Sequence, residues 1–317
     1  MSSYAVKPDD KTKIDLLLDE RSGSRVVINR HGGEVIGYRI AGPQGEIPLL
    51  YRDSLAQPPE KGWKNHATIL FPIVGGIKNK ESRLGSRVVR SPGNHGVARN
   101  SDFSLVESSS RGAASARYRL AANDYTRGFY PFEFQLDMLY RLEGNVLTTT
   151  FEITNPGAEP LYFCFGWHPG FRTPVIPGKG SKESCRLLFP EGSIRKYHNN
   201  EHCRLTGETS MIRVGGALPR TEKELEATLM YEIDDPSLRT VTLEDPAAGI
   251  SIRVDFPDLP HLGLWSEPGD EFICIEPWQG MDDHEEQEPF DQKVGIVVLP
   301  PGGKKAASVK VTPEIKG

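Results

Sequence analysis

Cysteine is scarce in this sequence of 317 residues, and its spacing argues against short metal or redox motifs. The four cysteines form no CxxC pair. Cys164 and Cys274 lie inside apolar, strand-like runs, and Cys185 and Cys203 lie elsewhere in the second half of the chain. Because a thiol in such a run usually packs like a small apolar side chain, we expect Cys164 and Cys274 to be buried and free.

Long hydrophobic runs are also missing. The best apolar stretch, Thr68 to Ile77, is interrupted by proline and glycine and is too short to cross a membrane. The segment Met1 to Lys13 is polar and has no apolar core of the kind found in signal peptides. The cytoplasm is therefore the expected location.

The charge balance excludes further classes of partner. A net charge of −5 gives no electrostatic reason to expect nucleic acid or an anionic membrane surface. Neither a glycine-rich phosphate loop nor a dinucleotide fingerprint occurs, so no nucleotide cofactor is expected.

Glycine and proline are frequent instead, with 32 and 25 residues, and the segments between them are short. Alternating apolar residues predict a hairpin over 134–153, with its turn at Glu143-Gly144-Asn145, and a second over 240–256. One short helix is predicted after the capping-box pattern at Thr221. The sequence predicts an all-β fold, a large antiparallel β-sandwich with few short helices. Further strands are expected at 26–28, 35–40, 161–165 and 294–299.

Length alone allows one large β domain or two ordinary ones. Neither a βαβ rhythm nor an internal repeat divides the chain. The loop 174–183 is the nearest thing to a linker, yet similar strand patterns flank it. We therefore expect residues 1–317 to form a single domain.

Three short motifs place ionisable side chains among glycine, proline and aromatic residues at the expected ends of apolar strands. Binding and catalytic side chains often occupy such positions on a rigid β scaffold. In the first, Gly96 permits a sharp turn beside His95, and Arg99 adds a cation. In the second, His168 precedes a proline that keeps its backbone extended as the strand ends. The motifs are 94–100, 166–171 and 272–280.

The third motif contains the most informative residue. An apolar run from Phe272 leads to Glu276, and Pro277 is expected to end the strand there because proline has no N–H for the ladder. A carboxylate at the rim of a buried strand, with Trp278 two residues on, suits a general base that faces a flat polar ligand.

With these motifs in hand, the sequence resembles the aldose 1-epimerases, and in particular a bacterial branch of the galactose mutarotase-like superfamily. The resemblance covers roughly Val26 to Pro301 and depends on the order and spacing of four segments. It implies a β-supersandwich with one open cleft, and interconversion of the α and β anomers of a free monosaccharide, a hexose, without a metal or organic cofactor. The matching segments are 71–75, 95–99, 166–171 and 275–278.

The resemblance also implies roles for individual residues. Glu276 matches the catalytic base of the family, His168 its catalytic acid, and His95 a second histidine that contacts the sugar. Trp278 and Trp167 are candidates for stacking on the sugar; plain packing is the alternative for Trp278 and the expected role of Trp167.

Two family features are missing or displaced. Relatives often carry an arginine after the glycine of the Phe-Pro-x-Val-Gly run, where this chain has Gly76. Lys78 or Arg99 is expected to compensate as a substrate-binding residue. The substrate-binding aspartate of the family has no clear counterpart, and Asp255 and Asp258 are the candidates.

Alternatives remain at this stage. The chain could be a sugar-binding or regulatory protein without turnover, or a mutarotase for hexose 6-phosphates. The second alternative requires a cluster of cations drawn from Lys78, Lys80, Arg83 and Arg99. Arg99 could instead pair with a carboxylate and brace its loop.

Structural rather than functional roles are expected for several other polar groups. The acidic run 282–288 is expected to be a solvated loop, and five histidines outside the motifs are expected to be surface or satisfied residues. Two histidines and a carboxylate could form a metal-binding facial triad, but the three residues are far apart in sequence and show no short metal-ligand spacing. Those five histidines are His66, His198, His202, His261 and His284.

Overall fold

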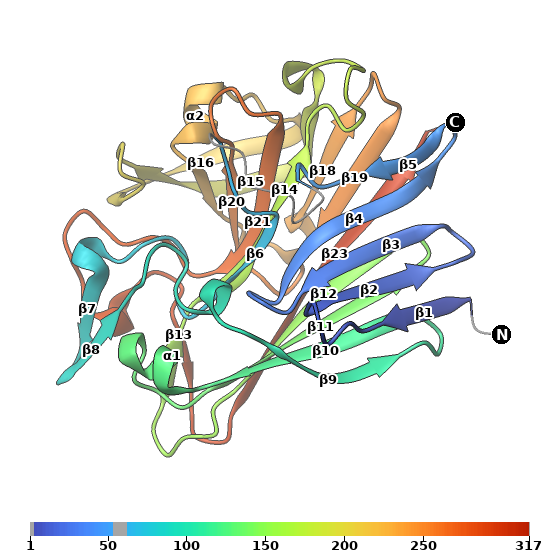
Figure 1. Ribbon diagram of the computed structural model, residues 1–317. Coiled ribbons are helices and arrows are strands. Elements are labelled where there is room, and N and C mark those ends of the chain that lie inside the picture. The colour runs from blue at the N-terminus through green and yellow to red at the C-terminus, as the bar shows by residue number, and fades with distance from the viewer. Residues whose placement is uncertain (1–2, 53–61, 317) are drawn as a thin grey trace.

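The computed structural model describes residues 3–52 and 62–316, and it has the predicted all-β architecture. Two antiparallel sheets form its body (Figure 1). In the five-stranded sheet, hydrogen-bonded neighbours follow the chain: β1 (Tyr4–Lys7), β2 (Ile14–Asp19), β3 (Ser24–Asn29), β4 (Glu34–Gly42) and β5 (Gly45–Pro48).

The second sheet is much larger, with fourteen strands. Its hydrogen-bonded order is β6 (Ala67–Leu70), β14 (Phe165–Arg172), β21 (Phe272–Gln279), β20 (His261–Trp265), β17 (Leu229–Glu232), β15 (Arg186–Asn199), β18 (Thr240–Asp245), β19 (Ile250–Asp255), β23 (Lys304–Ile315), β12 (Val146–Thr154), β11 (Gln135–Glu143), β10 (Ala114–Ala121) and β9 (Ser104–Ser109). Strand β16 (Leu205–Ala217) pairs with β15 beside this path.

The remaining elements are short. Two small pairs are β7 (Glu81–Leu84) with β8 (Arg87–Arg90), and β13 (Leu161–Phe163) with β22 (Val297–Leu299). The α-helices are α1 (Asp124–Phe129) and α2 (Glu222–Glu226), and the 3₁₀ turns are η1 (Lys78–Lys80), η2 (Ala98–Asn100), η3 (Lys182–Ser184), η4 (Pro236–Leu238) and η5 (Phe290–Gln292). Among the described residues, none of these helices could span a membrane.

Both predicted hairpins are confirmed as β11–β12 and β18–β19, since period-two alternation buries every second side chain. Helix α2 begins at the predicted Thr221 cap, but it ends at Glu226 because Leu229 already starts β17. Helix α1, capped by Asn123, was not predicted. The segment 174–183 connects β14 and β15 within one sheet, while the single-domain assignment of residues 1–317 stays a prediction.

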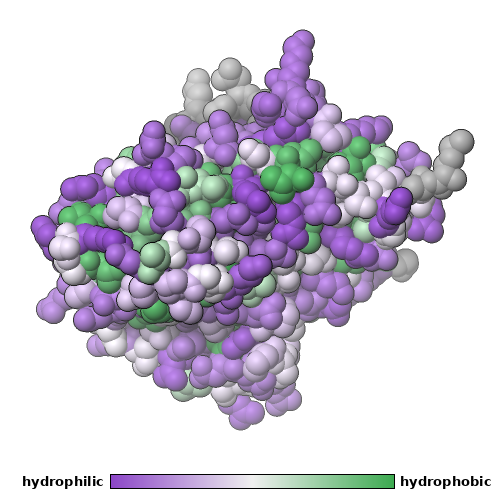
Figure 2. All heavy atoms as spheres, turned by 90° about the horizontal axis from the view of Figure 1, so that it is seen from below, coloured by the Kyte–Doolittle hydropathy of each residue, from purple (hydrophilic) through white to green (hydrophobic). Residues whose placement is uncertain are grey.

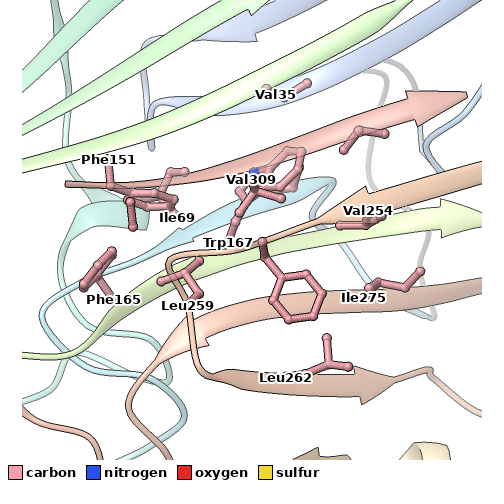
Figure 3. Close-up of a cluster of buried hydrophobic side chains, with 14 of the residues drawn as sticks. Val35, Ile69, Phe151, Phe165, Trp167, Val254, Leu259, Leu262, Ile275 and Val309 are labelled. Carbon is pink, nitrogen blue, oxygen red and sulfur yellow. The ribbon is translucent and has the colours of Figure 1, made fainter. Parts of the chain in front are cut away.

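The main hydrophobic core lies between the two sheets (Figures 1 and 3). In β14 the side chains of Phe165 and Trp167 point into this core, and Ile275 of the neighbouring β21 does the same. The indole of Trp167 donates to the carbonyl of Ala67 at 3.1 Å, which confirms its expected packing role. Outside, one face is largely covered by hydrophilic residues, with hydrophobic residues in small groups (Figure 2).

Alternation along the same strands sends polar residues to the opposite face of the large sheet. His168 follows the buried Trp167, and Glu276 follows the buried Ile275. The core residues therefore fix on which face the candidate site forms.

Two sequence-based expectations about strand ends are wrong. Strand β14 continues through His168 and Pro169 to Arg172, and β21 continues through Pro277 to Gln279. Pairing between these strands stops after Gly166↔Trp278 and resumes at Gly170↔Cys274. Both prolines fall inside this interval, so their missing N–H groups are accommodated without ending either strand.

The backbone at His95 and Gly96 adopts the left-handed region that the glycine was expected to permit, with φ of 69° and 77°. A Cβ at Gly96 would lie 2.4 Å from the carbonyl oxygen of Phe71. That strand-end residue cannot retreat easily because Val97 and Ala98 donate to the same oxygen.

We predict that Gly96→Ala lowers the free energy of unfolding by about 2–4 kcal/mol, combining left-handed strain with a backbone clash. The control is Gly112→Ala, where φ is 71° but nothing lies within 4 Å of the added carbon, so a loss of about 1–2 kcal/mol is expected. Urea unfolding measures both changes. Equal losses in the two variants would contradict the packing described around Gly96.

Candidate active site

A cavity of about 300 Å³ opens on the face of the large sheet that carries His168 and Glu276. Strands β14, β20 and β21 form its base, and loops from distant parts of the chain form its walls. The lining residues are Trp63, Asn65, Val74, Gly75, Asn94, His95, Arg99, His168, Cys203, Thr228, Met230, Trp265, Glu276, Trp278 and Asp282.

His168 and Glu276 form the most deeply buried polar pair of the cavity, 6% and 1% exposed. The register of β14 and β21 on either side of the interrupted pairing places them directly opposite each other. His168 Nε2 lies 3.3 Å from a carboxylate oxygen of Glu276. An imidazole and a carboxylate that are 108 residues apart in sequence therefore lie close enough to exchange a proton.

Burial controls the charge of this pair. Desolvation lowers the pKa of His168 to about 3, with the nearby Arg99 cation adding to the effect, and desolvation raises the pKa of Glu276 well above its usual value. Both shifts favour the uncharged forms, so the pair holds one proton between its two members. Within the described structure, His168 Nδ1 and Glu276 Oε1 have no hydrogen-bond partner.

His95 lies beside this pair as a neutral donor. Its ring is 5.2 Å from that of His168, centre to centre, and nearly perpendicular to it. The backbone N–H of Gly75 donates to His95 Nδ1 at 3.2 Å, so a neutral ring carries its proton on Nε2. Burial lowers the pKa of His95 well below its usual value, and repulsion from the Arg99 cation, and from His168 whenever that ring is protonated, adds to the effect.

Arg99 supplies the cationic part of the wall from turn η2. Its guanidinium has no hydrogen bond or ion pair in residues 3–52 and 62–316, which does not favour the alternative of a loop brace. Burial lowers the pKa of Arg99, partly offset by the Glu34 carboxylate nearby. Glu34 itself accepts from the backbone N–H groups of His66 and Ala67. Arg99 therefore presents free donors to the cavity.

Aromatic rings surround the imidazole of His168. Trp63 stacks on it at 5.1 Å with an interplanar angle of 20°, and Trp265 meets it edge-on at 5.8 Å. Trp278 forms part of the floor, and its ring packs so closely on Gly263 that a Cβ there would lie 2.4 Å away. These rings exclude water from the pair and offer flat apolar surface to a ligand.

The structure brings together Glu276, His168, His95, Arg99 and Trp278 but not Lys78. The Lys78 ammonium instead donates to the carbonyl oxygen of Glu285, and its backbone N–H donates to Asp283 at 2.7 Å. Neither candidate aspartate lines the cavity. Asp255 pairs with Arg253 at 3.1 Å, and Asp258 accepts from the backbone of Ser308 at 3.0 Å.

Sequence reasoning missed several lining residues, among them Trp63, Trp265 and Asp282. Asp282 belongs to the acidic run that was expected to be solvated, and that expectation is wrong for its first two residues. Asp282 and Asp283 are buried because they pair with Arg204 and Lys293, while Glu285 and Glu286 are exposed as expected. For Trp265 the available signal was the apolar alternation of β20, which places this residue on the same face as Gly263.

One group of side chains has the composition of a metal site. Potential ligand atoms of His168, Cys274 and Glu276 all lie within 4.8 Å of one another. This set differs from the considered facial triad, because a buried thiol takes the place of the second histidine. A soft cation such as Zn²⁺ could use these donors, but it would occupy both His168 and Glu276.

We predict that the His168 imidazole stays uncharged from pH 7 down to pH 5, because burial lowers its pKa below that range. Nitrogen-15 NMR of the histidine rings measures this directly, and the ring of the exposed His202 provides a comparison in the same spectrum. A His168 ring that is cationic at pH 7, or that becomes so by pH 5, would contradict the described environment.

Comparisons with known proteins identify the family and the fold of this chain. The family model for aldose 1-epimerase matches residues 15–312. The plasmid-encoded protein LacX of Lactococcus lactis subsp. lactis is 29% identical over 247 residues, which cover 72% of this chain and 78% of LacX. A galactose mutarotase related enzyme from Lactobacillus acidophilus has a similar structure, with a TM-score of 0.82 and 26% identity over 98% of this chain and 97% of that one.

More distant structures share the fold. A galactose mutarotase-like protein from Lactobacillus casei has a TM-score of 0.81 at 23% identity, covering 98% of this chain and all of that one. A putative aldose 1-epimerase from Escherichia coli K12 has a TM-score of 0.66 at 18% identity, covering 93% and 97%. Because the family model spans nearly the whole chain, this protein belongs to the aldose 1-epimerase family.

Proposed function

We propose that this protein is an aldose 1-epimerase that interconverts the α and β anomers of a free hexose in the cytoplasm by acid–base ring opening and closure. The observation that carries the proposal is the His168–Glu276 pair, buried and 3.3 Å apart at the base of a cavity. Family membership supports the reaction class.

The chemistry needs one group that accepts a proton and one that donates it. Ring opening removes the proton of the anomeric hydroxyl and adds a proton to the ring oxygen, which breaks the bond between C1 and that oxygen. Both oxygens are attached to C1, so two groups in direct contact can reach them together. After rotation about C1–C2, the same groups act in reverse and close the ring on its other face.

A shared proton suits this cycle. With one proton between them, one member of the pair is always a donor and the other an acceptor. In the ring-opening direction we assign Glu276 as the base and His168 as the acid, so the proton that burial favours on Glu276 first passes to His168 across their 3.3 Å contact. The free Oε1 of Glu276 and the free Nδ1 of His168 leave each group with capacity for a ligand.

The other walls suit a polar, neutral sugar. His95 directs an Nε2–H donor and Arg99 a free guanidinium toward hydroxyl or ring oxygens. Trp278, Trp63 and Trp265 offer apolar faces for the C–H groups of a pyranose. Hydroxyl and C–H groups together describe a hexose better than a flat aromatic or a charged ligand.

The two alternatives receive less support. Of the four cations expected for a hexose 6-phosphate site, Arg99 is the one that lines the cavity in the described residues. The non-catalytic sugar-binding alternative keeps the cavity, but it gives no reason for two proton-transfer groups to be buried in contact.

We predict that the protein accelerates mutarotation of fresh α-glucose or α-galactose, measured by polarimetry, and that Glu276→Gln and His168→Gln each lower kcat by about 10²–10⁴-fold. The control is Glu314→Gln, an exposed residue on β23, which should retain full activity.

Two results would contradict this prediction. Retained activity in both variants would remove the pair from the mechanism. Absence of acceleration over a broad panel of aldoses, together with aldose binding by calorimetry, would instead favour the non-catalytic sugar-binding protein.

A second prediction concerns Arg99. Arg99→Met should raise KM for a neutral hexose about tenfold or more, since a hydrogen bond to a charged group contributes about 1.5–3 kcal/mol, while kcat changes less. Arg213→Met, which changes an exposed arginine, is the control. Hexose 6-phosphate that competes far better than the neutral hexose would favour the phosphate alternative.

A further inference from the structure

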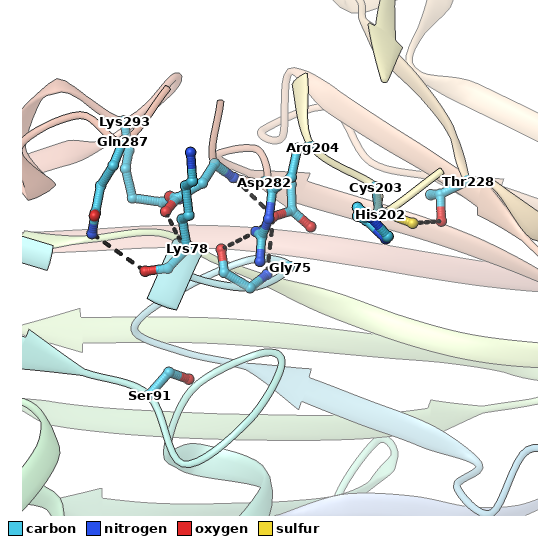
Figure 4. Close-up of polar contacts among 12 residues, drawn as sticks. Gly75, Lys78, Ser91, His202, Cys203, Arg204, Thr228, Asp282, Gln287 and Lys293 are labelled. Carbon is cyan, nitrogen blue, oxygen red and sulfur yellow. Dashed lines mark hydrogen bonds and ion pairs between the residues drawn. The ribbon is translucent and has the colours of Figure 1, made fainter. Parts of the chain in front are cut away.

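A second polar cluster borders the cavity beside Gly75, where Asp282 and Arg204 meet (Figure 4). It combines the Asp282 carboxylate, which follows β21, with the Arg204 guanidinium, which comes from the turn between β15 and β16. These residues are far apart in sequence and meet beside two adjacent glycines. The cluster is not part of the acid–base pair.

Asp282 uses one of its two carboxylate oxygens for the protein. Oδ1 accepts from Arg204 Nη1, from the backbone N–H of Gly76 at 3.2 Å and from that of Asp283 at 2.8 Å. No donor to Oδ2 occurs in the described residues, and this side chain lines the cavity. The second oxygen is therefore available to a ligand.

The glycines make room for both side chains. A Cβ at Gly75 would lie 2.2 Å from Asp282 Oδ2, and a Cβ at Gly76 would lie 3.0 Å from Arg204 Nη2. Arg204 Nη1 also donates to the Gly76 carbonyl oxygen at 3.0 Å. The guanidinium of Arg204 thus occupies the space that a side chain at position 76 would take, although Arg204 belongs to a different part of the chain.

Charge in the cluster is balanced in pairs. Asp283, next along the chain, forms a buried ion pair with Lys293, so Arg204 is left as the direct partner of Asp282. Arg204 does not itself line the cavity. Its contact with a ligand therefore runs through Asp282, which makes Arg204 a positioning residue.

We propose that Asp282 is a specificity-determining residue that accepts a hydrogen bond from one sugar hydroxyl through Oδ2, and that Arg204 holds this carboxylate in place through Oδ1. The inference rests on the proposed sugar-binding function and adds a hydroxyl-reading group to it. A carboxylate at this end of the cavity favours a free hydroxyl and disfavours a phosphate or carboxylate substituent there.

The first test uses binding alone. Calorimetry with D-glucose and its 2-, 3-, 4- and 6-deoxy analogues should give one analogue that the wild type binds about tenfold or more weakly because Asp282 loses its donor. Asp282→Ala should bind glucose about tenfold more weakly and no longer discriminate against that analogue. A merely structural role for Asp282 would weaken all five sugars alike.

The second test removes the guanidinium of Arg204 and supplies another one from position 76. Arg204→Ala should weaken glucose binding about tenfold, and adding Gly76→Arg in the same chain should restore most of it, because the new arginine starts from the space next to Asp282. Arg204→Lys, which keeps the charge, serves as the milder variant if Arg204→Ala does not fold.

The outcomes separate the two claims. Wild type that binds none of the monosaccharides would overturn both the proposed function and this inference. Wild type that binds and mutarotates glucose, while Asp282→Ala keeps both the affinity and the full discrimination between analogues, would overturn this inference alone.

Discussion

The antiparallel register of β14 against β21 is the constraint on which the site depends. It sets His168 opposite Glu276, and alternation puts both on the face away from the core, whose packing fixes Trp167 and Ile275 on the other side. A slip of β14 by one residue would turn His168 toward the core, and the same slip of β21 would turn Glu276 there. The apolar burial that stabilises the sheet therefore also fixes this register, and with it the relative position of His168 and Glu276.

Burial determines the charge state of His168 and Glu276. The rings of Trp63 and Trp265 enclose the imidazole, so the charged forms of His168 and Glu276 are both disfavoured and one proton remains between them. Two prolines in the adjoining strand positions interrupt the ladder at this point, and the pairing on either side preserves the geometry.

Local sequence patterns predicted the repeating parts of the fold and the deepest part of the site. The hairpins at 134–153 and 240–256, the Thr221 cap and the sharp turn at Gly96 follow from alternation and glycine chemistry over a few residues. The short motifs likewise indicated His95, His168 and Glu276.

Local patterns could not predict contacts between remote segments. Asp282 looked like part of a solvated acidic run because its partner Arg204 lies 78 residues earlier, and Lys78 looked available because its partner Glu285 lies far along the chain. Pro277 seemed to end a strand whose neighbours in fact sustain it.

A structure of the Glu276→Gln variant with a bound aldohexose tests the central claim most directly. We expect the C1 hydroxyl and the ring oxygen both to lie within hydrogen-bonding distance of residues 276 and 168, with C1 at the base of the cavity. A hexose bound with its anomeric carbon remote from both residues, in a site that is otherwise intact, would contradict it.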